Sequence, residues 1–462
     1  MPSPGSTEHP LLVAVVGAGP SGFYAAEELL KQTGVSARVD LFDQLPTPFG
    51  LVRGGVAPDH QKIKTVTKVY DKTAARPGFR FVGNVSFGKD LSLEDLLAHY
   101  HMVLFSTGAQ TDRRMGIPGE DLPGSEPATD FVAWYNGHPA YSHLTFPLNH
   151  PRVAVVGNGN VAMDVVRMLA APLEELKKTD IADAALEALA HSKVTDIWLL
   201  GRRGPAQAAF TNPEIRELGE LPGVEIHLHP EELALDPGSQ EFLAAADNPV
   251  HKRNVDILNE IAAKPRTGAP RRIHIRFLVS PTAITGGSRV EGLTLEKNQL
   301  VKDGRGGLSA QGTGQTETLP VDMVFRSIGY KGIGLPGVPF DDRKGVIPNQ
   351  GGRVAGTDGA LPRLYTAGWI KRGPSGVIGT NKACAVETVK AMLEDLPNLP
   401  LPPGFQGTPD RLLEGLQKKG VQTVSYPEWQ KLDQEETRRG AAQGRPRMKF
   451  TSVKEMLNFL GK

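Results

Sequence analysis

Residues 11–22 constrain the fold of this 462-residue chain more than any other stretch. Residues 11–16 are apolar and rich in β-branched side chains, which predicts a fully buried strand of a parallel sheet. The strand leads into Gly17, Gly19 and Gly22, spaced as Gly-x-Gly-x-x-Gly, and a helix is expected over 23–30. Glycines with this spacing permit a tight turn, the approach of a pyrophosphate to the backbone and close helix–strand packing. The stretch predicts a dinucleotide-binding unit, with the pyrophosphate on the helix N-terminus.

An acidic residue at the end of the next predicted strand supports this interpretation. That strand spans 38–42 and is followed by Asp43. Asp43 lies about 20 residues beyond the last glycine, where a carboxylate can bind ribose hydroxyls. The alternative is an ordinary strand–turn–helix without a ligand. The combination of strand, glycines, helix and acid favours a nucleotide site.

The next segment, residues 45–60, is rich in proline and glycine and is expected to form a loop. It is unusually apolar for a loop, since loops normally run over the surface. Such a loop needs something large and flat to pack against, and an isoalloxazine ring would suit. The alternative is a loop that folds into an ordinary core.

A second nucleotide unit begins near the middle of the chain. Residues 152–156 predict a strand, residues 157–162 read Gly-x-Gly-x-x-Ala, and a helix is expected over 161–169. The inserted stretch 172–191 is interpreted as a helical excursion on the surface. The following strand, 196–200, restores the nucleotide-binding pattern.

Two arginines follow that strand at the position where an NAD site carries an acid. Arg202 and Arg203 can bind a 2′-phosphate bidentately, whereas an acid would repel it. The alternative is a solvated basic turn. We therefore expect FAD in the first site and NADP(H) in the second.

Composition excludes several other classes. The single cysteine, Cys384, cannot form an intrachain disulfide or hold an iron–sulfur cluster, so thiol–disulfide reductases are excluded. No metal site is expected. The net charge of +1 gives no reason to expect nucleic acid as a partner, and no apolar stretch approaches the roughly 20 residues that span a bilayer. Residues 1–9 resemble neither a signal nor a transit peptide, so we expect a cytoplasmic protein without membrane insertion.

These motifs, in this order, resemble adrenodoxin reductase and its bacterial ferredoxin–NADP reductase relatives, within the glutathione-reductase-like flavoproteins. The resemblance covers most of residues 10–395. The matching motifs are residues 17–22, 48–53, 56–60, 159–162, 201–205, 209–211, 327–330 and 368–374. The resemblance implies an α/β fold with two Rossmann-like dinucleotide-binding domains. An NADP-binding domain, 111–325, would be inserted in a discontinuous FAD-binding domain, 1–110 and 326–462.

The resemblance also implies a set of cofactor contacts. FAD would contact Ser21, Asp43, Leu51, Val85, Trp369, Gly376, Val377 and Ile378. NADP would contact Asn158, Gly159, Asn160, Val161, Arg202, Arg203, Glu214 and Gly376. Trp369 and the Gly376 turn would lie beside the flavin and nicotinamide. Asp43 stands where relatives often have Glu, which shortens the reach to the ribose by a methylene.

The implied activity is hydride transfer from NADPH to FAD, followed by single-electron transfer to an acidic ferredoxin-type iron–sulfur protein. Lys31, Lys252 and Arg253 resemble positions that dock such a partner. A flavin monooxygenase is the alternative, although the Phe-x-Gly-x-x-x-His motif of that class is not found between the two units. A dinucleotide-sensing binding protein without enzymatic activity is a third interpretation.

Three further residues are predicted to act near the nicotinamide and the flavin. His60, Asp164 and Glu214 follow the motif loops that are expected to converge there. Hydride transfer itself needs no protein acid, but a histidine could hold the nicotinamide amide or relay the proton of later one-electron steps. Alternatively, His60 only braces the Pro58-Asp59 loop.

Overall fold

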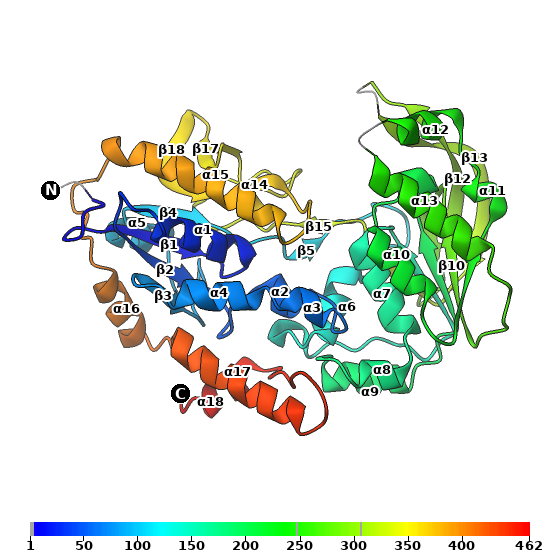
Figure 1. The fold of residues 1–462 in the computed structure, drawn as a ribbon, viewed down its shortest axis with the longest axis horizontal. Helices are drawn as coiled ribbons and strands as arrows, with labels where there is room; N and C mark the ends of the chain where they lie inside the picture. Colours follow the sequence, from blue (N-terminus) through cyan, green and yellow to red (C-terminus); the bar gives the residue numbers. More distant parts are fainter. Residues whose placement is uncertain (1–3, 246–247, 305–306) are drawn as a thin grey trace. The chain divides into compact units, whose positions relative to one another are not determined.

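The computed structural model describes residues 4–245, 248–304 and 307–462, which divide into two units (Figure 1). Unit 1 comprises Met1–Thr111, Asn136–Ser142 and Tyr330–Lys462, and unit 2 comprises Asp112–Tyr135 and His143–Gly329. The units differ from the boundaries expected from the sequence in three places: Thr111 and residues 136–142 belong to unit 1, and residues 326–329 belong to unit 2. Lys449 of unit 1 contacts the 136–142 segment, since its Nζ donates to the backbone oxygen of Asn136 at 3.1 Å.

Unit 1 is built on a seven-stranded sheet in the order β16-β17-β18-β4-β1-β2-β3. The strands are β1 (Leu11–Val16), β2 (Ala37–Phe42), β3 (Phe79–Val82), β4 (Met102–Phe105), β16 (Asn349–Gln350), β17 (Arg353–Gly356) and β18 (Gly359–Thr366). The five strands from β18 to β3 are parallel, and β16 and β17 add antiparallel pairings at one edge. The carboxyl ends of the parallel strands therefore meet at one edge, where α/β sheets bind ligands.

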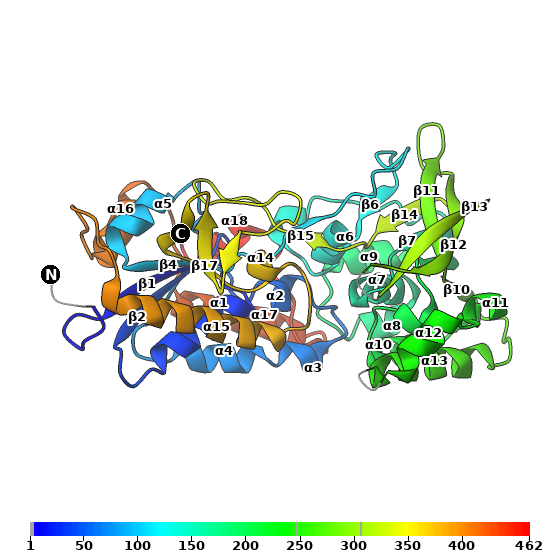
Figure 2. The same ribbon diagram turned by 90° about the horizontal axis from the view of Figure 1, so that it is seen from above.

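Unit 1 also contains ten α-helices among the described residues, and those with buried side chains cover both faces of this sheet. They are α1 (Pro20–Leu30), α2 (Leu51–Gly54), α3 (Gln61–Lys64), α4 (Thr67–Ala74), α5 (Leu93–His99), α14 (Trp369–Arg372), α15 (Thr380–Asp395), α16 (Pro409–Lys418), α17 (Tyr426–Ala441) and α18 (Val453–Phe459). Odd-numbered residues of β1 share a core with α1, α15 and α17, and even-numbered ones share another with α5 and α16. Figure 2 shows α1 and α15 side by side. Burial on both faces explains the uninterrupted apolar run of β1.

Unit 2 holds a six-stranded parallel sheet in the order β6-β14-β7-β8-β10-β9. Its strands are β6 (Ser125–Pro127), β7 (Arg152–Val156), β8 (Asp196–Leu200), β9 (Val224–Leu228), β10 (Arg271–Arg276) and β14 (Met323–Arg326). An antiparallel sheet of β11 (Val279–Thr285), β12 (Gly292–Lys302) and β13 (Leu308–Pro320) packs against it through a shared apolar core. Two short strands form a separate sheet: β5 (Thr111–Asp112), at which unit 1 gives way to unit 2 along the chain, and β15 (Tyr330–Lys331) of unit 1.

The helices of unit 2 include the segment predicted to be a surface excursion. They are α6 (Ala128–Tyr135), α7 (Asn160–Ala170), α8 (Leu173–Leu176), α9 (Asp183–Ala190), α10 (Asn212–Gly219), α11 (Pro230–Leu233), α12 (Pro237–Ala244) and α13 (Pro249–Ala262). Residues 172–191 contain the predicted helical structure, in α8 and α9, but the prediction that this segment lies on the surface was wrong. Leu176 is 2% exposed and Ile181 is 1% exposed, so apolar side chains anchor this insertion in the unit. Among the helices of the described residues, none has the length and apolar character needed to cross a bilayer.

Candidate nucleotide sites

The turn between β1 and α1 has the form that a bound pyrophosphate requires. Gly17 has φ +109°, and a Cβ atom there would lie 2.6 Å from the backbone oxygen of Ser106. A Cβ on Gly22 would lie 2.2 Å from the Gly17 oxygen, so only glycine allows this close packing of helix on turn. Gly19 caps α1 without any side-chain hydrogen bond. The first backbone N–H groups of α1 therefore have no side-chain acceptor at the cap, as suits an anion site.

Asp43 lies at the carboxyl end of β2 and holds this turn in place. Its Oδ2 accepts a hydrogen bond from the Ala18 N–H at 2.9 Å, and its Oδ1 accepts one from the Leu45 N–H at 3.0 Å. Burial raises the pKa of the Asp43 carboxyl to about 6, against the opposing effect of these two hydrogen bonds. The carboxylate thus connects the glycine turn to the loop that follows β2.

The loop 45–60 contains the one-turn helix α2 and is anchored at two points. Phe49 has φ +85° and is 6% exposed, and its N–H donates to the Ala18 oxygen at 2.8 Å. Arg53 forms a bidentate ion pair with Glu436 of α17, whose side chain is fully buried. Burial opposes ionisation of Glu436, but the guanidinium of Arg53 keeps its pKa below the usual value. The apolar side chains of Phe49 and Val52 in this loop are therefore part of the hydrophobic core of unit 1.

Two predicted flavin contacts lie within this region. Leu51 is half-buried at the start of α2. Val85 is 2% exposed, belongs to the core beneath the sheet, and donates its N–H to the Asp43 oxygen at 2.9 Å. The Val85 side chain therefore packs inside the protein.

Trp369 and the turn that follows it are held by Arg372. The indole Nε1 of Trp369 donates to the Ser375 oxygen at 3.2 Å, and the Arg372 guanidinium also donates to that oxygen. Gly376 lies in the turn with φ +78°, Val377 is 60% exposed, and the next residue, Ile378, is half-buried. These predicted contacts thus lie on one exposed, hydrogen-bonded turn before α15.

Ser21 joins the first turn of α1 to this segment. Its Oγ donates to the Oδ1 atom of Asn381 at 3.2 Å, and Asn381 lies in the first turn of α15. A Cβ on Gly368 would lie 2.1 Å from the Ser21 Oγ atom, so the two segments are in direct contact. The structure therefore brings the first glycine motif and the 368–381 segment together, although about 350 residues separate them.

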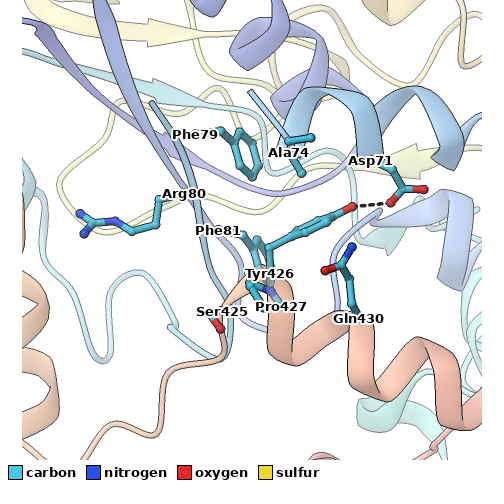
Figure 3. A pocket seen from close by; sticks show the side chains of 10 residues that line it. Asp71, Ala74, Phe79, Arg80, Phe81, Ser425, Tyr426, Pro427 and Gln430 are labelled. Atoms are coloured by element: carbon cyan, nitrogen blue, oxygen red, sulfur yellow. Dashed lines mark hydrogen bonds between the residues drawn. The ribbon is translucent and has the colours of Figure 1, made fainter. Parts of the chain in front are cut away.

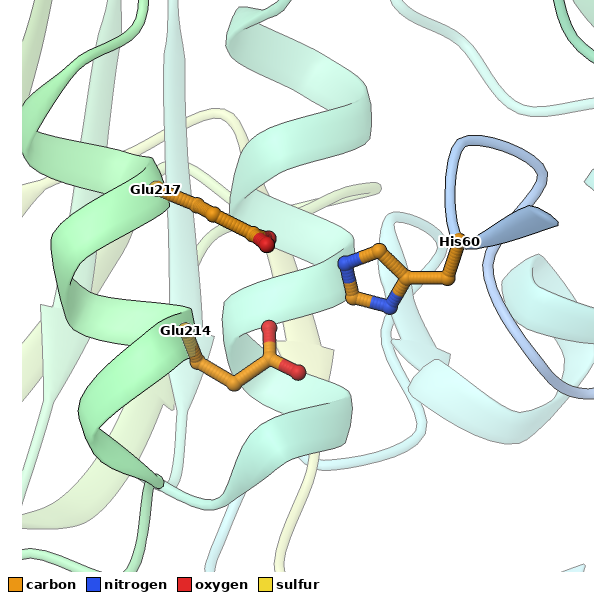
Figure 4. Close-up of side chains that lie close together, drawn as sticks. All are labelled: His60, Glu214 and Glu217. Carbon is orange, nitrogen blue, oxygen red and sulfur yellow. The ribbon is translucent and has the colours of Figure 1, made fainter. Parts of the chain in front are cut away.

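His60 stands at the end of the 45–60 loop and begins α3 (Figure 4). Its N–H donates to the Ala57 oxygen at 3.0 Å, and its own oxygen accepts from the Ile63 N–H at 3.1 Å. The side chain is half-buried. The backbone of His60 is thus fixed by the helix start, as the bracing interpretation requires, and its ring is partly accessible.

Unit 2 repeats the first turn between β7 and α7. Gly157 has φ +119°, and a Cβ there would lie 2.2 Å from the Ser327 oxygen. Gly159 caps α7 without a side-chain hydrogen bond and has open space beside its Cα. Asn160 accepts a hydrogen bond from the Thr211 N–H at 2.9 Å, which ties the turn to the start of α10. Asn158 packs over the next strand end, and Val161 is half-buried in the first turn of α7.

Arg202 and Arg203 follow β8 on a turn whose backbone is fixed on both sides. The Arg202 oxygen accepts from Asn298 Nδ2 at 2.9 Å, and the Arg203 oxygen accepts from the Leu278 N–H at 3.1 Å. Within residues 4–245, 248–304 and 307–462, neither guanidinium has a hydrogen-bond or ion-pair partner. Burial, and then the charge of Arg202, lower the pKa of Arg203. Two adjacent guanidiniums without a counter-charge form a site for an anion.

Asp164 and Glu214 meet on a buried arginine that the sequence analysis missed. Arg167 is 3% exposed, and it donates to Asp164 Oδ1 at 2.6 Å and to Glu214 Oε2 at 3.0 Å. Asp164 lies on α7, and Glu214 lies on α10 together with Glu217 (Figure 4). The two glutamates place carboxylate oxygens within 4.8 Å of one another. The two helices are thus joined by a buried ion-pair cluster.

Comparison with known proteins assigns the chain to a family. Residues 15–81 match the family described as NAD(P)-binding Rossmann-like domain. NADPH-ferredoxin reductase FprA of Mycobacterium tuberculosis is 45% identical over 456 residues, which cover 97% of this chain and 98% of that one. The mitochondrial NADPH:adrenodoxin oxidoreductase of Salvelinus fontinalis is 43% identical, covering 96% of this chain and 90% of that one. The chain belongs to the NADPH–ferredoxin reductase family of the adrenodoxin reductase type.

The fold of this family member also agrees with a solved structure. Mycobacterium tuberculosis FprA in complex with NADPH matches it with a TM-score of 0.91 and 44% identity, covering 97% of this chain and 99% of that one. The resemblance and the α/β fold class inferred from the motifs are therefore confirmed.

Three residues that hold the predicted site residues in place were not themselves predicted: Arg372, Arg167 and Glu436. Arg372 lies inside the 368–374 motif, so the motif itself could have indicated it. Arg167 stands one turn after Asp164, a spacing that predicts an ion pair on a helix. Glu436 gave no local signal, because its partner Arg53 is 383 residues away.

Proposed function

We propose that unit 1 of this NADPH–ferredoxin reductase binds FAD and that unit 2 binds NADPH. The enzyme moves a hydride from NADPH to FAD and then single electrons to a ferredoxin-type iron–sulfur protein. FAD, when bound, supplies the step that no side chain can perform, because it accepts two electrons together and releases them singly. The residues of the chain bind, orient and surround the two nucleotides.

The proposed FAD contacts form two groups in unit 1. One group lies around the first glycine turn, and the other lies on the turn before α15. The groups comprise Gly17, Gly19, Ser21, Gly22, Asp43, Leu51 and Val85, and Trp369, Gly376, Val377 and Ile378. Support comes from the uncapped start of α1, which suits a pyrophosphate, and from the Asp43 carboxylate at the strand end.

The arginine pair carries the assignment of NADPH to unit 2. Arg202 and Arg203 have no acidic partner among the described residues, and burial already lowers the pKa of Arg203. A dianionic 2′-phosphate would compensate both charges, whereas a free ribose hydroxyl would compensate neither. Asn158, Gly159, Asn160 and Val161 would hold the pyrophosphate at the start of α7, and Glu214 and Gly376 would lie nearer the nicotinamide.

His60, Asp164 and Glu214 are proposed to act near the nicotinamide and the flavin. His60 would orient the nicotinamide amide or relay the proton of the one-electron steps. Arg167 donates a hydrogen bond to both Asp164 and Glu214 and would hold the two carboxylates in this arrangement.

The docking residues proposed for an acidic partner are Lys31, Lys252 and Arg253. Lys31 pairs with Glu28 at 2.5 Å, and Arg253 pairs with Glu260 at 3.0 Å, so local acids partly neutralise both. Lys252 is exposed, and in the described part of the chain it has no ion pair.

Steady-state kinetics with two nicotinamide donors and two acceptors tests this function. NADPH should support reduction of both ferricyanide and an acidic [2Fe–2S] ferredoxin, and NADH should be a much poorer donor for both. Substrate-dependent oxygen consumption without ferredoxin reduction would reject the proposal in favour of a monooxygenase.

A further inference from the structure

Four exposed cationic side chains lie along the α3–α4 segment of unit 1. Lys62, Lys68, Lys72 and Arg76 are all exposed, and we refer to them as the α3–α4 basic surface. Within the described residues, none of the four side chains forms an ion pair or a hydrogen bond. The chain as a whole carries a net charge of only +1, so this is a local concentration of positive charge.

Helix stability does not account for this pattern. Lys68, Lys72 and Arg76 are spaced by four residues, which places them on one side of α4 and its C-terminal end. Like charges at this spacing repel one another. Lys68 also lies in the first turn, which contains no acid and where the helix dipole disfavours a cation.

The acid nearest in sequence to Lys68 and Lys72 is directed elsewhere. Asp71 lies between Lys68 and Lys72, but its Oδ1 accepts a hydrogen bond from the Tyr426 hydroxyl at 2.5 Å. Figure 3 shows this bond at a cavity of about 360 Å³ between α4, β3 and the start of α17. Asp71 is therefore held towards α17 and forms no ion pair with either lysine.

Two aliphatic side chains accompany the cations. Ile63 is 45% exposed and Val69 is 38% exposed, although both are large and apolar. Protein interfaces combine such apolar contacts with complementary charge, and the charge raises the rate of association. The segment thus has the composition of a docking surface.

We propose that the α3–α4 basic surface docks the acidic iron–sulfur partner of the reductase. This inference rests on the proposed function, which requires such a partner. α3 begins directly after His60, so a partner docked here lies next to a segment assigned to the nicotinamide and flavin. Lys31 and Arg253 are paired with acids, whereas these four cations are available to carboxylates of a partner.

The test combines four substitutions and a charge-matched control on the full-length holoenzyme. The test variant carries Lys62→Gln, Lys68→Gln, Lys72→Gln and Arg76→Gln. The control carries Lys390→Gln, Arg411→Gln, Lys418→Gln and Lys419→Gln, which are also exposed cations of unit 1 without an ion pair among the described residues. Each variant loses four positive charges. A difference in ferredoxin binding between the two variants therefore depends on where the charges were removed.

An acidic [2Fe–2S] ferredoxin is the probe, and both its binding and its reduction are measured across ionic strengths. The test variant should bind it about ten-fold more weakly at low salt, with a similar loss in kcat/KM and a flatter salt dependence. The control should stay within about two-fold of wild type. Equal losses in the two variants, or no loss in the test variant, would overturn the proposal.

A second pair of measurements separates this inference from the proposed function. Ferricyanide reduction by NADPH needs no docked protein, so it reports the flavin site directly. If wild type reduces neither acceptor, the proposed function fails, while the binding titration still tests the surface. If Lys252→Gln with Arg253→Gln abolishes binding and the α3–α4 variant does not, the docking surface lies on unit 2.

Discussion

The guanidinium of Arg372 donates a hydrogen bond to the side-chain oxygen of Asn381 at 2.9 Å. It also donates to Thr380 Oγ1 at 3.1 Å and to the Ser375 oxygen. One side chain therefore joins both ends of the 373–379 turn, which we assign to the flavin and the nicotinamide. Because Asn381 also accepts from Ser21, the same network reaches the first glycine motif.

Replacement of Arg372 by Gln should weaken FAD binding by about 2 kcal/mol, because charge-assisted hydrogen bonds in the turn are lost. Arg372→Lys should recover only part of this loss, because an ammonium cannot reproduce the planar fork. FAD dissociation and the fluorescence of Trp369 report the effect, since the indole shares the Ser375 acceptor. Unchanged FAD affinity and fluorescence in Arg372→Gln would show that the network does not position the turn.

Loss of the arginine pair should change cofactor choice. Arg202→Ala with Arg203→Ala should weaken NADPH binding by a few kcal/mol, because each charge-assisted contact contributes about 1.5–3 kcal/mol. NADH lacks the 2′-phosphate, so its kcat/KM should change far less. Equal losses with the two donors would refute the assignment of these arginines.

Asp43 should make the stability of the apoprotein depend on pH. The pKa of its carboxyl is about 6 in the folded chain and about 3.8 when unperturbed, so the folded state binds the proton more tightly. The resulting stabilisation, about 3 kcal/mol, is fully present below pH ~4 and is lost as the pH rises to ~6. Asp43→Asn removes this titration.

Urea unfolding of the apoprotein between pH ~4 and ~7.5 measures the effect. The free energy of unfolding of Asp43→Asn, relative to that of wild type, should rise between pH about 4 and pH about 6 and then level off. Identical pH profiles for the two proteins would contradict the raised pKa.

The role of His60 is tested by His60→Gln, which keeps a hydrogen-bonding side chain but cannot exchange protons. Flavin reduction by NADPH should slow by roughly ten-fold and change its pH profile, with FAD still bound. Stopped-flow absorption measures the step in isolation from ferredoxin. If His60→Gln reduces the flavin at the wild-type rate at every pH, His60 has only a structural role in the 45–60 loop and at the start of α3.

The parts of the fold that depend on short spacings could be predicted from the sequence. The two glycine turns, Asp43 and the arginine pair each lie within one strand–turn–helix unit, where chain geometry restricts the outcome. Long-range pairs were not predictable, because nothing near Glu436 indicates that Arg53 will neutralise it in the core. The burial of Ile181 was missed because the charged residues around it suggested a surface segment.

Ion pairs in the folded chain decide which cations are available to an acidic partner. Lys31 and Arg253 match expected docking positions, yet Lys31 pairs with Glu28 and Arg253 pairs with Glu260 in the folded chain. Lys68 and Lys72 belong to no motif, and the structure singles them out because they have no acidic partner among the described residues. Electrostatic complementarity therefore has to be assessed on the folded surface.

Anaerobic absorption spectroscopy of the purified protein tests the central claim most directly. The protein should be yellow, and one equivalent of NADPH should bleach the flavin band, whereas the same amount of NADH should have little effect. Oxidised [2Fe–2S] ferredoxin added afterwards should restore the band as the ferredoxin becomes reduced. A colourless protein, or a flavin band that NADPH leaves unchanged, would contradict the account.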